Sequence, residues 1–337
     1  MKKIGVAIIG LGRIGRVHAE VFMAHVENAR LVAVADAVEE LARSVGERFG
    51  VKWYKDYDTL LKDPEVDAVV ICTPTFLHAE MIIKAAEAGK HIFCEKPMTV
   101  TSDEAKRVIS AVEKAGVKLM VGYMRRFDEA YLNAKKLIEE GKIGRPIMFI
   151  SIARDPAPPP GWAADPKLSG GIFLDMLSHD FDMARWLIGS EVKEVYVHGG
   201  VYMFPEEIGK KGDLDVVSIS FKFENGVLGY IHGTRKNVYG YDLRTEIYGT
   251  DGIIYVGARE NNLFSYGRPD GLVFLGVKWF EKRFYDAYIA EDRHFIECVI
   301  EDKTPLITGN DGLRAVQIAE ACWRSYREGR PVTVSYE

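Results

Sequence analysis

The stretch KIGVAIIGLGRIGRVHAE, residues 3–20, indicates the fold that the rest of the chain continues. An uninterrupted apolar run, residues 4–9, ends at a glycine and is followed by an amphipathic segment. Strands that are apolar on both faces are typical of a parallel sheet covered by helices on both sides. The same alternation recurs with further apolar runs at residues 29–36, 66–73, 90–95 and 117–123. The pattern therefore predicts a doubly wound parallel α/β domain over residues 1–123.

The pattern changes after residue 123. Residues 192–280 read mainly as strands and turns, and VVSISFKF, residues 216–223, alternates apolar and polar side chains. Asn225-Gly226, directly after it, is a strong hairpin signal. Such alternation describes an antiparallel sheet with one face buried and the other polar or open to a partner. We therefore expect residues 124–337 to form an α+β domain with a large, mostly antiparallel, open-faced sheet.

Composition argues against several classes of partner. The formal net charge of −5 offers no positive field for nucleic acid or for an anionic membrane. No stretch approaches the roughly 20 apolar residues that are needed to span a bilayer. The four cysteines are widely spaced and form no CxxC pair. We therefore expect buried thiols in a reducing cytoplasm, with neither disulfides nor a metal site.

Three glycines, Gly10, Gly12 and Gly15, spell G-x-G-x-x-G where the first predicted strand meets the first helix. In this motif the first glycine permits a tight turn, the second lets a pyrophosphate approach the backbone, and the third allows close packing. Asp36 follows about 20 residues further on, at the end of the second apolar run. Its carboxylate can accept hydrogen bonds from ribose hydroxyls and would repel a 2′-phosphate. The motif therefore predicts a dinucleotide site that prefers NAD to NADP.

Further candidates lie beyond the other apolar runs, because ligands of open parallel sheets bind outside the carboxyl ends of the strands. Besides the glycines and Asp36, the expected cofactor-binding residues are Arg13, Ile14, Thr73, Pro74, His78, Glu95, Lys96, Met124 and Arg126. Lys96 stands out because it follows an apolar strand, precedes a proline and is expected to face the nicotinamide ring. Taken by its position alone, such a lysine is more often a solvated surface charge.

A second cluster lies in SGGIFLDMLSHDFDMARWL, residues 169–187, which reads as one apolar helix. On a continuous α-helix, Asp175, His179 and Asp182 would project from one side within an arc of roughly 60°. A histidine suits the removal of a hydroxyl proton because its ordinary pKa is close to neutral, and a carboxylate one turn away can fix its tautomer. Taken alone, the residues favour a structural Asp–His pair that anchors the helix, with Arg185 satisfying the other acids.

Five segments occur in an order that resembles a known family: GLGRIG with Asp36, CEKPM at 94–98, GYMRRFD at 122–128, ARDPAPPP at 153–160 and GGIFLDMLSHDFD at 170–182. Together they are similar to the glucose–fructose oxidoreductase/inositol dehydrogenase/MocA-type family, over essentially the whole chain. Within it, residues 153–182 look most like bacterial myo-inositol 2-dehydrogenases. The resemblance implies an NAD-dependent enzyme that oxidises a ring hydroxyl of a cyclitol or sugar, most closely myo-inositol to 2-keto-myo-inositol. It also implies a homotetramer packed through the open sheet faces.

The resemblance further implies that Lys96, Asp175 and His179 are catalytic. Lys96 would donate to the reacting hydroxyl and help to place the nicotinamide, while His179 would accept the proton. The substrate contacts implied are Lys96, Arg126, Asp155, Asp175, His179, Asp182 and Tyr239, or Tyr241 in place of Tyr239.

Three other functions stay open at this point. They are a sugar or scyllo-inositol dehydrogenase of the same family, a glycosidase that oxidises its substrate transiently and regenerates NAD, and a non-catalytic NAD-binding sensor. Trp162 and Ser178 depart from the pattern of the inositol enzymes beside the expected pocket. The exact polyol is therefore left open.

Overall fold

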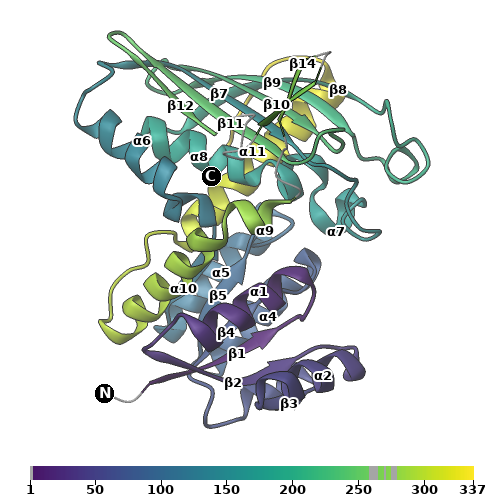
Figure 1. Ribbon diagram of the computed structural model, residues 1–337, viewed down its shortest axis with the longest axis vertical. Helices are drawn as coiled ribbons and strands as arrows, with labels where there is room; N and C mark the ends of the chain where they lie inside the picture. The colour runs from purple at the N-terminus through teal and green to yellow at the C-terminus, as the bar shows by residue number, and fades with distance from the viewer. Residues whose placement is uncertain (1–2, 258–264, 269–270, 275–278) are drawn as a thin grey trace. The chain divides into compact units, whose positions relative to one another are not determined.

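A computed structural model describes residues 3–257, 265–268, 271–274 and 279–337 of the chain (Figure 1). Two compact units make up the chain. The first comprises Met1–Phe127 and Tyr285–Leu313, and the second comprises Asp128–Phe284 and Arg314–Glu337. None of the helices within the described ranges is both long and apolar enough to cross a membrane.

The first unit is built on a six-stranded parallel sheet. Its strands are β1 (Ile4–Ile9), β2 (Ala29–Ala35), β3 (Lys52–Tyr54), β4 (Ala68–Ile71), β5 (His91–Glu95) and β6 (Leu119–Gly122), in the order β3-β2-β1-β4-β5-β6. The chain winds outward in both directions from the pair β1 and β4, which confirms the predicted doubly wound domain. In such sheets, ligands bind outside the carboxyl ends of the strands, at the place where the strand order reverses. Here that place lies between β1 and β4.

Helices cover this sheet, and local sequence explains their ends. They are α1 (Arg13–Ala24), α2 (Glu39–Phe49), α3 (Tyr57–Leu61), α4 (Thr75–Glu87) and α5 (Ser102–Ala115), followed by the 3₁₀ turn η1 (Met124–Phe127). At the start of α5, Thr101 and Glu104 each accept the other's backbone amide, which forms a capping box. Gly116 ends that helix with a φ of +67°, a left-handed conformation that favours glycine.

The helix α10 (Tyr285–Ile300) packs within the first unit. Its buried Asp292 contacts His18 of α1, and the ring of Phe295 lies 5.8 Å from that of Phe93 on β5. The predicted division into residues 1–123 and 124–337 had placed this helix in the second domain. In the structure, α10 belongs to the first unit instead, because its buried face packs against α1 and β5. These segments are far apart in sequence, so their contact could not be read from local pattern.

The second unit contains a seven-stranded, mostly antiparallel sheet, as predicted. In spatial order its strands are β12 (Ile253–Val256), β11 (Asp242–Gly249), β7 (Pro146–Arg154), β10 (Leu228–Thr234), β9 (Val216–Phe223), β8 (Val192–Gly200) and β15 (Val332–Thr333). Only the pairing of β7 with β10 is parallel. The strands β13 (Ser265–Arg268) and β14 (Gly271–Phe274) form a separate hairpin, and part of the predicted strand region, 258–264, 269–270 and 275–278, lies outside the described residues.

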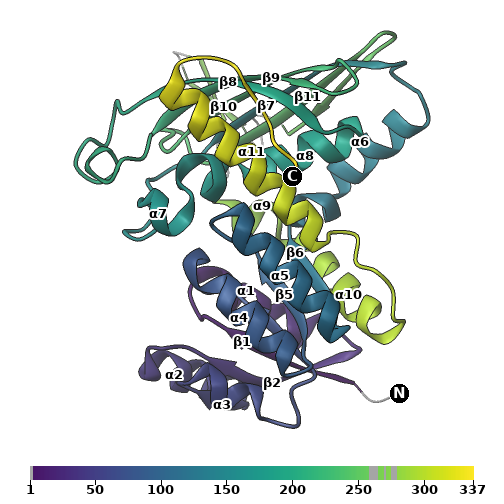
Figure 2. The same cartoon turned by 180° about the vertical axis from the view of Figure 1, so that it is seen from behind.

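The second unit also contains helical segments. They are α6 (Glu129–Glu139), α7 (Pro166–Ser169), the π-helical turn η2 (Ile172–Met176), α8 (Ser178–Ile188), the 3₁₀ turn η3 (Gly209–Lys211), α9 (Phe280–Arg283) and α11 (Gly309–Glu328), which begins in the first unit. Of these, α8 and α11 lie along one face of the sheet (Figure 2). Strand β9 shows the predicted alternation, since Ile219 and Phe221 are buried while Ser220 and Lys222 are exposed. The other face of the sheet exposes apolar and tyrosine side chains, among them Leu228, Tyr230, Tyr248 and Tyr255.

Candidate active site

The glycine loop at the carboxyl end of β1 has the geometry that a pyrophosphate requires. Gly10 has a φ of +85°, and a Cβ added to Gly15 would lie 1.9 Å from the carbonyl oxygen of Gly10. Glycine at these two positions therefore lets α1 begin directly against β1. A Cβ added to Gly12 would meet no atom of the described residues within 4 Å. Gly12 is the N-cap residue of α1 and makes no side-chain hydrogen bond to the first turn of the helix, the place where helix amides bind anions.

Asp36 is held beside this loop at the end of β2. Its Oδ2 accepts the backbone amide of Leu11 at 2.8 Å, and its Oδ1 accepts the amide of Val38, also at 2.8 Å. The carboxylate is half-buried. Each oxygen keeps further lone-pair capacity that adenosine ribose hydroxyls can use. The glycine loop and Asp36 therefore fit the adenosine diphosphate part of NAD.

His78 joins two loops that follow neighbouring strands. Its Nε2 lies 2.7 Å from the carbonyl oxygen of Thr73, and its Nδ1 lies 2.8 Å from that of Pro97. Burial lowers the pKa of His78, although both carbonyls favour the protonated ring. Because the ring is 1% exposed and both nitrogens face carbonyls, its contribution to the predicted cofactor site is to hold Thr73 and Pro97 in place.

Lys96 follows β5 and is half-buried. Its backbone amide donates to Glu95 Oε2 at 3.0 Å, and the Lys96–Pro97 peptide is cis. The Glu95 carboxylate turns inward, where its Oε1 lies 3.1 Å from His18 Nε2. Both oxygens of Glu95 thus contact protein groups, so Glu95 acts on the predicted cofactor site through the peptide of Lys96.

Met124 and Arg126 lie in η1, directly after the sheet, and both are buried. Arg126 donates from Nη2 to Asp311 Oδ1 at 2.8 Å and from Nη1 to the Leu306 carbonyl at 3.3 Å. These bonds hold η1 against residues 306–311 of the same unit. Contact of Arg126 with a ligand stays a prediction.

Residues 169–187 do not form the single α-helix that the spacing predicts. Gly170 and Gly171 have φ values of +78° and +69°, and the π-helical turn η2 follows them. Within it the Leu177 amide donates to the Ile172 carbonyl at 3.1 Å, a bond to the fifth residue before it. Since α8 begins only at Ser178, the predicted continuous α-helix is wrong, and the common side of Asp175, His179 and Asp182 stays a prediction. Asp175 lies in the π turn, while His179 and Asp182, 8% and 0% exposed, lie in α8.

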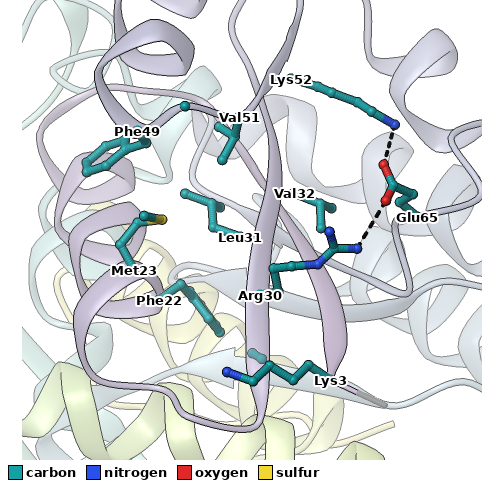
Figure 3. Close-up of a pocket in the computed structure, with 12 residues that line it drawn as sticks. Lys3, Phe22, Met23, Arg30, Leu31, Val32, Phe49, Val51, Lys52 and Glu65 are labelled. Atoms are coloured by element: carbon teal, nitrogen blue, oxygen red, sulfur yellow. Dashed lines mark hydrogen bonds and ion pairs between the residues drawn. The ribbon is translucent and has the colours of Figure 1, made fainter.

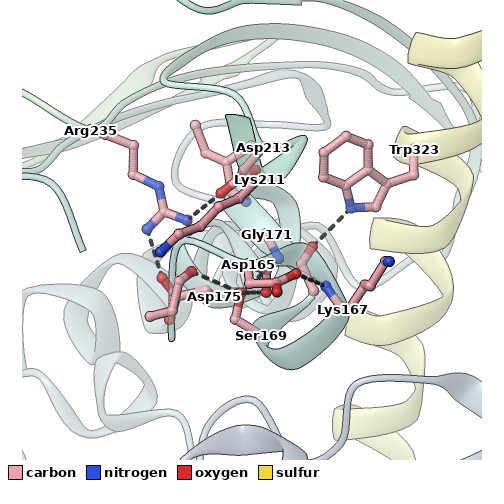
Figure 4. Close-up of polar contacts among 12 residues, drawn as sticks. Asp165, Lys167, Ser169, Gly171, Asp175, Lys211, Asp213, Arg235 and Trp323 are labelled. Carbon is pink, nitrogen blue, oxygen red and sulfur yellow. Dashed lines mark hydrogen bonds and ion pairs between the residues drawn. The ribbon is translucent and has the colours of Figure 1, made fainter. Parts of the chain in front are cut away.

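Arg235, which the sequence analysis did not single out, organises the π turn (Figure 4). Its Nη1 donates to Asp175 Oδ2 at 2.6 Å, and its Nη2 donates to Asp213 Oδ2 at 3.3 Å. The guanidinium is buried, which lowers the pKa of Arg235, but the charges of Asp175 and Asp213 outweigh burial and raise it. The other oxygen of Asp213, Oδ1, accepts the Ile172 amide at 2.9 Å. No local pattern could have revealed Arg235, because it follows β10, far along the chain from Asp175.

The glycine pair is enclosed on two sides. Trp323 of α11 donates from Nε1 to the Gly170 carbonyl at 2.8 Å (Figure 4). A Cβ added to Gly171 would lie 2.6 Å from Asp213 Oδ1 and 2.7 Å from Trp323 Cζ2. The chain therefore passes between α11 and Asp213 in a place that only glycine fits.

The remaining predicted substrate residues fall into two places. Asp155 is half-buried, its amide donates to the Thr234 carbonyl at 3.0 Å, and its charge also raises the pKa of Arg235. Asp155 and Asp175 thus both act on Arg235. Tyr239 is 45% exposed, donates from its hydroxyl to Asp242 Oδ2 at 2.7 Å and accepts from Arg154 Nη1 at 2.8 Å. No described contact joins Tyr239 to Asp175.

A surface pocket of about 530 Å³ lies elsewhere in the first unit (Figure 3). It is lined by residues at the amino ends of β1 and β2 and around the ends of α1 and α2, including Phe22, Leu31 and Phe49. None of the predicted site residues lines it. Because ligands of doubly wound sheets bind at the opposite, carboxyl ends of the strands, this pocket is not the cofactor site.

Family models match both the parallel-sheet part and the antiparallel-sheet part of the chain. The model for the oxidoreductase family with an NAD-binding Rossmann fold matches residues 4–123, and the GFO/IDH/MocA C-terminal domain matches residues 131–255. The chain is 41% identical to the scyllo-inositol 2-dehydrogenase (NAD(+)) of Bacillus subtilis, covering 97% of this chain and 95% of that protein. It is also 41% identical to the myo-inositol 2-dehydrogenase of Thermotoga maritima, with 97% of each covered.

A solved structure shows the same fold. The scyllo-inositol dehydrogenase of Lactobacillus casei, crystallised with bound NAD(H) and scyllo-inositol, superposes with a TM-score of 0.92 at 30% identity. The match covers 99% of each chain. The fold therefore recurs in a protein whose structure holds NAD(H) and a cyclitol.

Proposed function

Because the chain belongs to the Gfo/Idh/MocA family of NAD-dependent oxidoreductases, we propose that it oxidises a ring secondary hydroxyl of a cyclitol to the ketone. The favoured substrate is myo-inositol, with 2-keto-myo-inositol as its product. The observation that carries this proposal is the similarity of nearly the whole chain to inositol 2-dehydrogenases, two of which are 41% identical to it. The glycine loop and Asp36 support it, because they fit NAD.

The reaction requires two transfers from one alcohol. When bound, NAD accepts the carbon-bound hydrogen as hydride. The hydroxyl proton must leave at the same time, and we assign its removal to the imidazole of His179. Lys96 donates a hydrogen bond to the same oxygen, which stabilises the negative charge that develops there as the proton departs. This assignment requires that both groups reach one hydroxyl.

Asp175 supports the base in this proposal. A carboxylate near an imidazole stabilises the imidazolium that forms when the ring takes up a proton. Arg235 holds the Asp175 carboxylate at 2.6 Å, and Asp213 holds Arg235 in turn. The position of Asp175 is therefore set by buried ion pairs, so it is arranged before substrate arrives.

The open face of the second unit's sheet supports self-association, and we propose that it forms the contact of a homotetramer. Leu228 is 48% exposed and Tyr255 is 65% exposed on strands of this face. Several large apolar and tyrosine side chains gathered on one sheet face are typical of a protein–protein interface.

The test is turnover of the purified chain with NAD, followed by the absorbance of NADH. We expect reduction of NAD with myo-inositol, and scyllo-inositol, glucose and xylose serve as comparisons. Turnover with a sugar alone would correct the substrate, and no turnover with any of them would reject the proposal. Nitrophenyl glycosides without added NAD test the alternative glycosidase reaction.

Two variants test the assigned residues. Lys96→Ala and His179→Ala should each lower turnover by about two orders of magnitude or more while leaving NAD affinity nearly intact. NAD affinity is measured separately by quenching of tryptophan fluorescence. Full activity of His179→Ala would show that another group is the base.

A further inference from the structure

A buried cluster of one histidine and three carboxyl groups lies in the first unit, behind Lys96. It consists of His18 on α1, Glu95 at the end of β5, and Glu291 and Asp292 on α10. His18, Glu291 and Asp292 are 0% exposed, and Glu95 is 6% exposed. Burying this many ionisable groups is costly unless they pair with one another, so their arrangement calls for a physical reason.

Hydrogen bonds connect three of these groups to Lys96 in one line. Both oxygens of Asp292 lie close to His18 Nδ1, at 2.9 and 3.0 Å. The other ring nitrogen of His18, Nε2, lies 3.1 Å from Glu95 Oε1. The second oxygen of Glu95 accepts the backbone amide of Lys96 at 3.0 Å. The line thus runs from α10 through α1 to the peptide of Lys96.

His18 is held as an imidazolium in this line. Burial alone lowers the pKa of His18, but the charges and hydrogen bonds of Asp292 and Glu95 outweigh burial and raise it well above its usual value. A protonated ring has a donor on each nitrogen, which matches a carboxylate on each side. The ionisable groups around the ring are Asp292 and Glu291 from α10 and Glu95 from β5, and the rings of Phe93 and Tyr288 pack edge-on against it.

Glu291 is the neutral member of the cluster. Neither of its carboxyl oxygens has a hydrogen-bond partner within the described part of the chain, and burial together with Glu95 raises its pKa well above the usual value. Oxygen and nitrogen atoms of His18, Glu95 and Glu291 lie within 4.8 Å of one another, which is close enough to consider a metal ion. The geometry favours the hydrogen-bonded line instead, because both ring nitrogens of His18 already face carboxylate oxygens, Nδ1 those of Asp292 and Nε2 that of Glu95.

We propose that Asp292 and His18 are positioning residues for Lys96: they hold the Glu95 carboxylate, which fixes the peptide of Lys96 and thereby directs its ammonium group. This inference rests on the catalytic role proposed above for Lys96. None of the three residues touches substrate in this account. Their effect is on the placement of a donor, for which an error of about 1 Å can cost a hundredfold in rate.

Two neighbouring buried acids provide the test, since Asp292 belongs to the line and Glu291 does not. Asp292→Asn should lower kcat by about tenfold to a hundredfold, with the KM for NAD changed by less than about twofold. Glu291→Gln replaces a neutral acid by an amide of the same shape, so its kcat should stay within about twofold of wild type. Each variant is also checked by its melting temperature and circular dichroism.

The pH dependence of kcat separates positioning from simple loss of structure. Removing the charge of Asp292 lowers the pKa of His18, because burial is then opposed by Glu95 alone, so the ring in Asp292→Asn loses its proton at a lower pH than in wild type and regains it on acidification. The kcat of Asp292→Asn relative to wild type should therefore rise as the pH falls. A variant that is merely less stable shows no such recovery.

Several outcomes would overturn the inference. They are a wild-type kcat in Asp292→Asn, equal losses in Asp292→Asn and Glu291→Gln, or one divalent metal ion per chain of the wild-type protein in native mass spectrometry with zinc added. If Asp292→Asn does not fold, Glu95→Gln breaks the same line, and a wild-type kcat in that variant overturns the inference equally. Lys96→Ala is measured in parallel: if it keeps full turnover, the proposed role of Lys96 fails. Loss in Lys96→Ala without loss in Asp292→Asn refutes the positioning alone.

Discussion

Replacing Arg235 with methionine removes the guanidinium that contacts both Asp175 and Asp213. The side chain of Arg235 is 1% exposed, that of Asp213 is 0% exposed and that of Asp175 is 19% exposed. Removing one partner of a buried ion pair costs about 3–5 kcal/mol, because the other charge is left uncompensated. Asp213 is the carboxylate that suffers this penalty, since Asp175 retains some contact with solvent. We therefore expect Arg235→Met to lower the free energy of unfolding by an amount in this range.

Chemical unfolding in urea, followed by circular dichroism, measures this change. The double variant Arg235→Met with Asp213→Asn removes the uncompensated charge as well, so it should be more stable than Arg235→Met alone. Arg235→Lys keeps the charge but loses the two-pronged geometry, and its loss should lie between wild type and Arg235→Met. Turnover should fall in both single variants, because Asp175 loses the group that orients it.

A free energy of unfolding of Arg235→Met within about 1 kcal/mol of wild type would refute this reasoning. It would mean that the two carboxylates find protons or water at little cost. Equal stability of the single and double variants would refute the specific role of Asp213. Undiminished turnover in Arg235→Met would refute the claim that Asp175 is oriented by this ion pair.

Three further predictions concern other parts of the chain. Asp36→Asn removes a charge that repels a 2′-phosphate, so the ratio of kcat/KM for NAD over NADP should fall by about tenfold or more, and an unchanged ratio would contradict the role of Asp36. Gly171→Ala and Gly189→Ala both place alanine at positive φ, but Gly189 has open space around it, so Gly171→Ala should lose about 1–3 kcal/mol more of unfolding free energy, and equal losses would contradict the crowding. Leu228→Lys and Tyr230→Lys place charges on the open sheet face and should yield smaller species in sedimentation velocity, whereas unchanged oligomers would exclude this face as the contact.

The glycine loop and Asp36 could be predicted because their information is local. A strand, a turn and a helix follow one another within residues 4–24. The glycines of the turn are required there for steric reasons that the sequence itself shows. The open sheet could be predicted for the same reason, since apolar and polar side chains alternate along β9 and so indicate which face is buried. Such signals need no knowledge of distant segments.

The π turn could not be predicted, because the expected arc of Asp175 and His179 assumed one uniform helix. The two positive-φ glycines before it depend on Asp213 and Trp323, which approach from distant parts of the chain. The role of Arg235 escaped for the same reason. The amphipathic character of α10 likewise indicates that one face is buried, but it does not indicate against which strand or helix.

The return of residues 285–313 to the first unit has a practical consequence for protein engineering. A gene fragment that stops at residue 123 would encode all six parallel strands but leave His18 without Asp292 and Phe93 without Phe295. Such a fragment would expose the apolar surface that α10 covers, including Phe93, and should aggregate when expressed alone. A self-sufficient cofactor-binding module would instead need α10 supplied in cis, for example through a short linker that joins residue 127 to residue 285. Chimeras between relatives would likewise have to exchange both segments together.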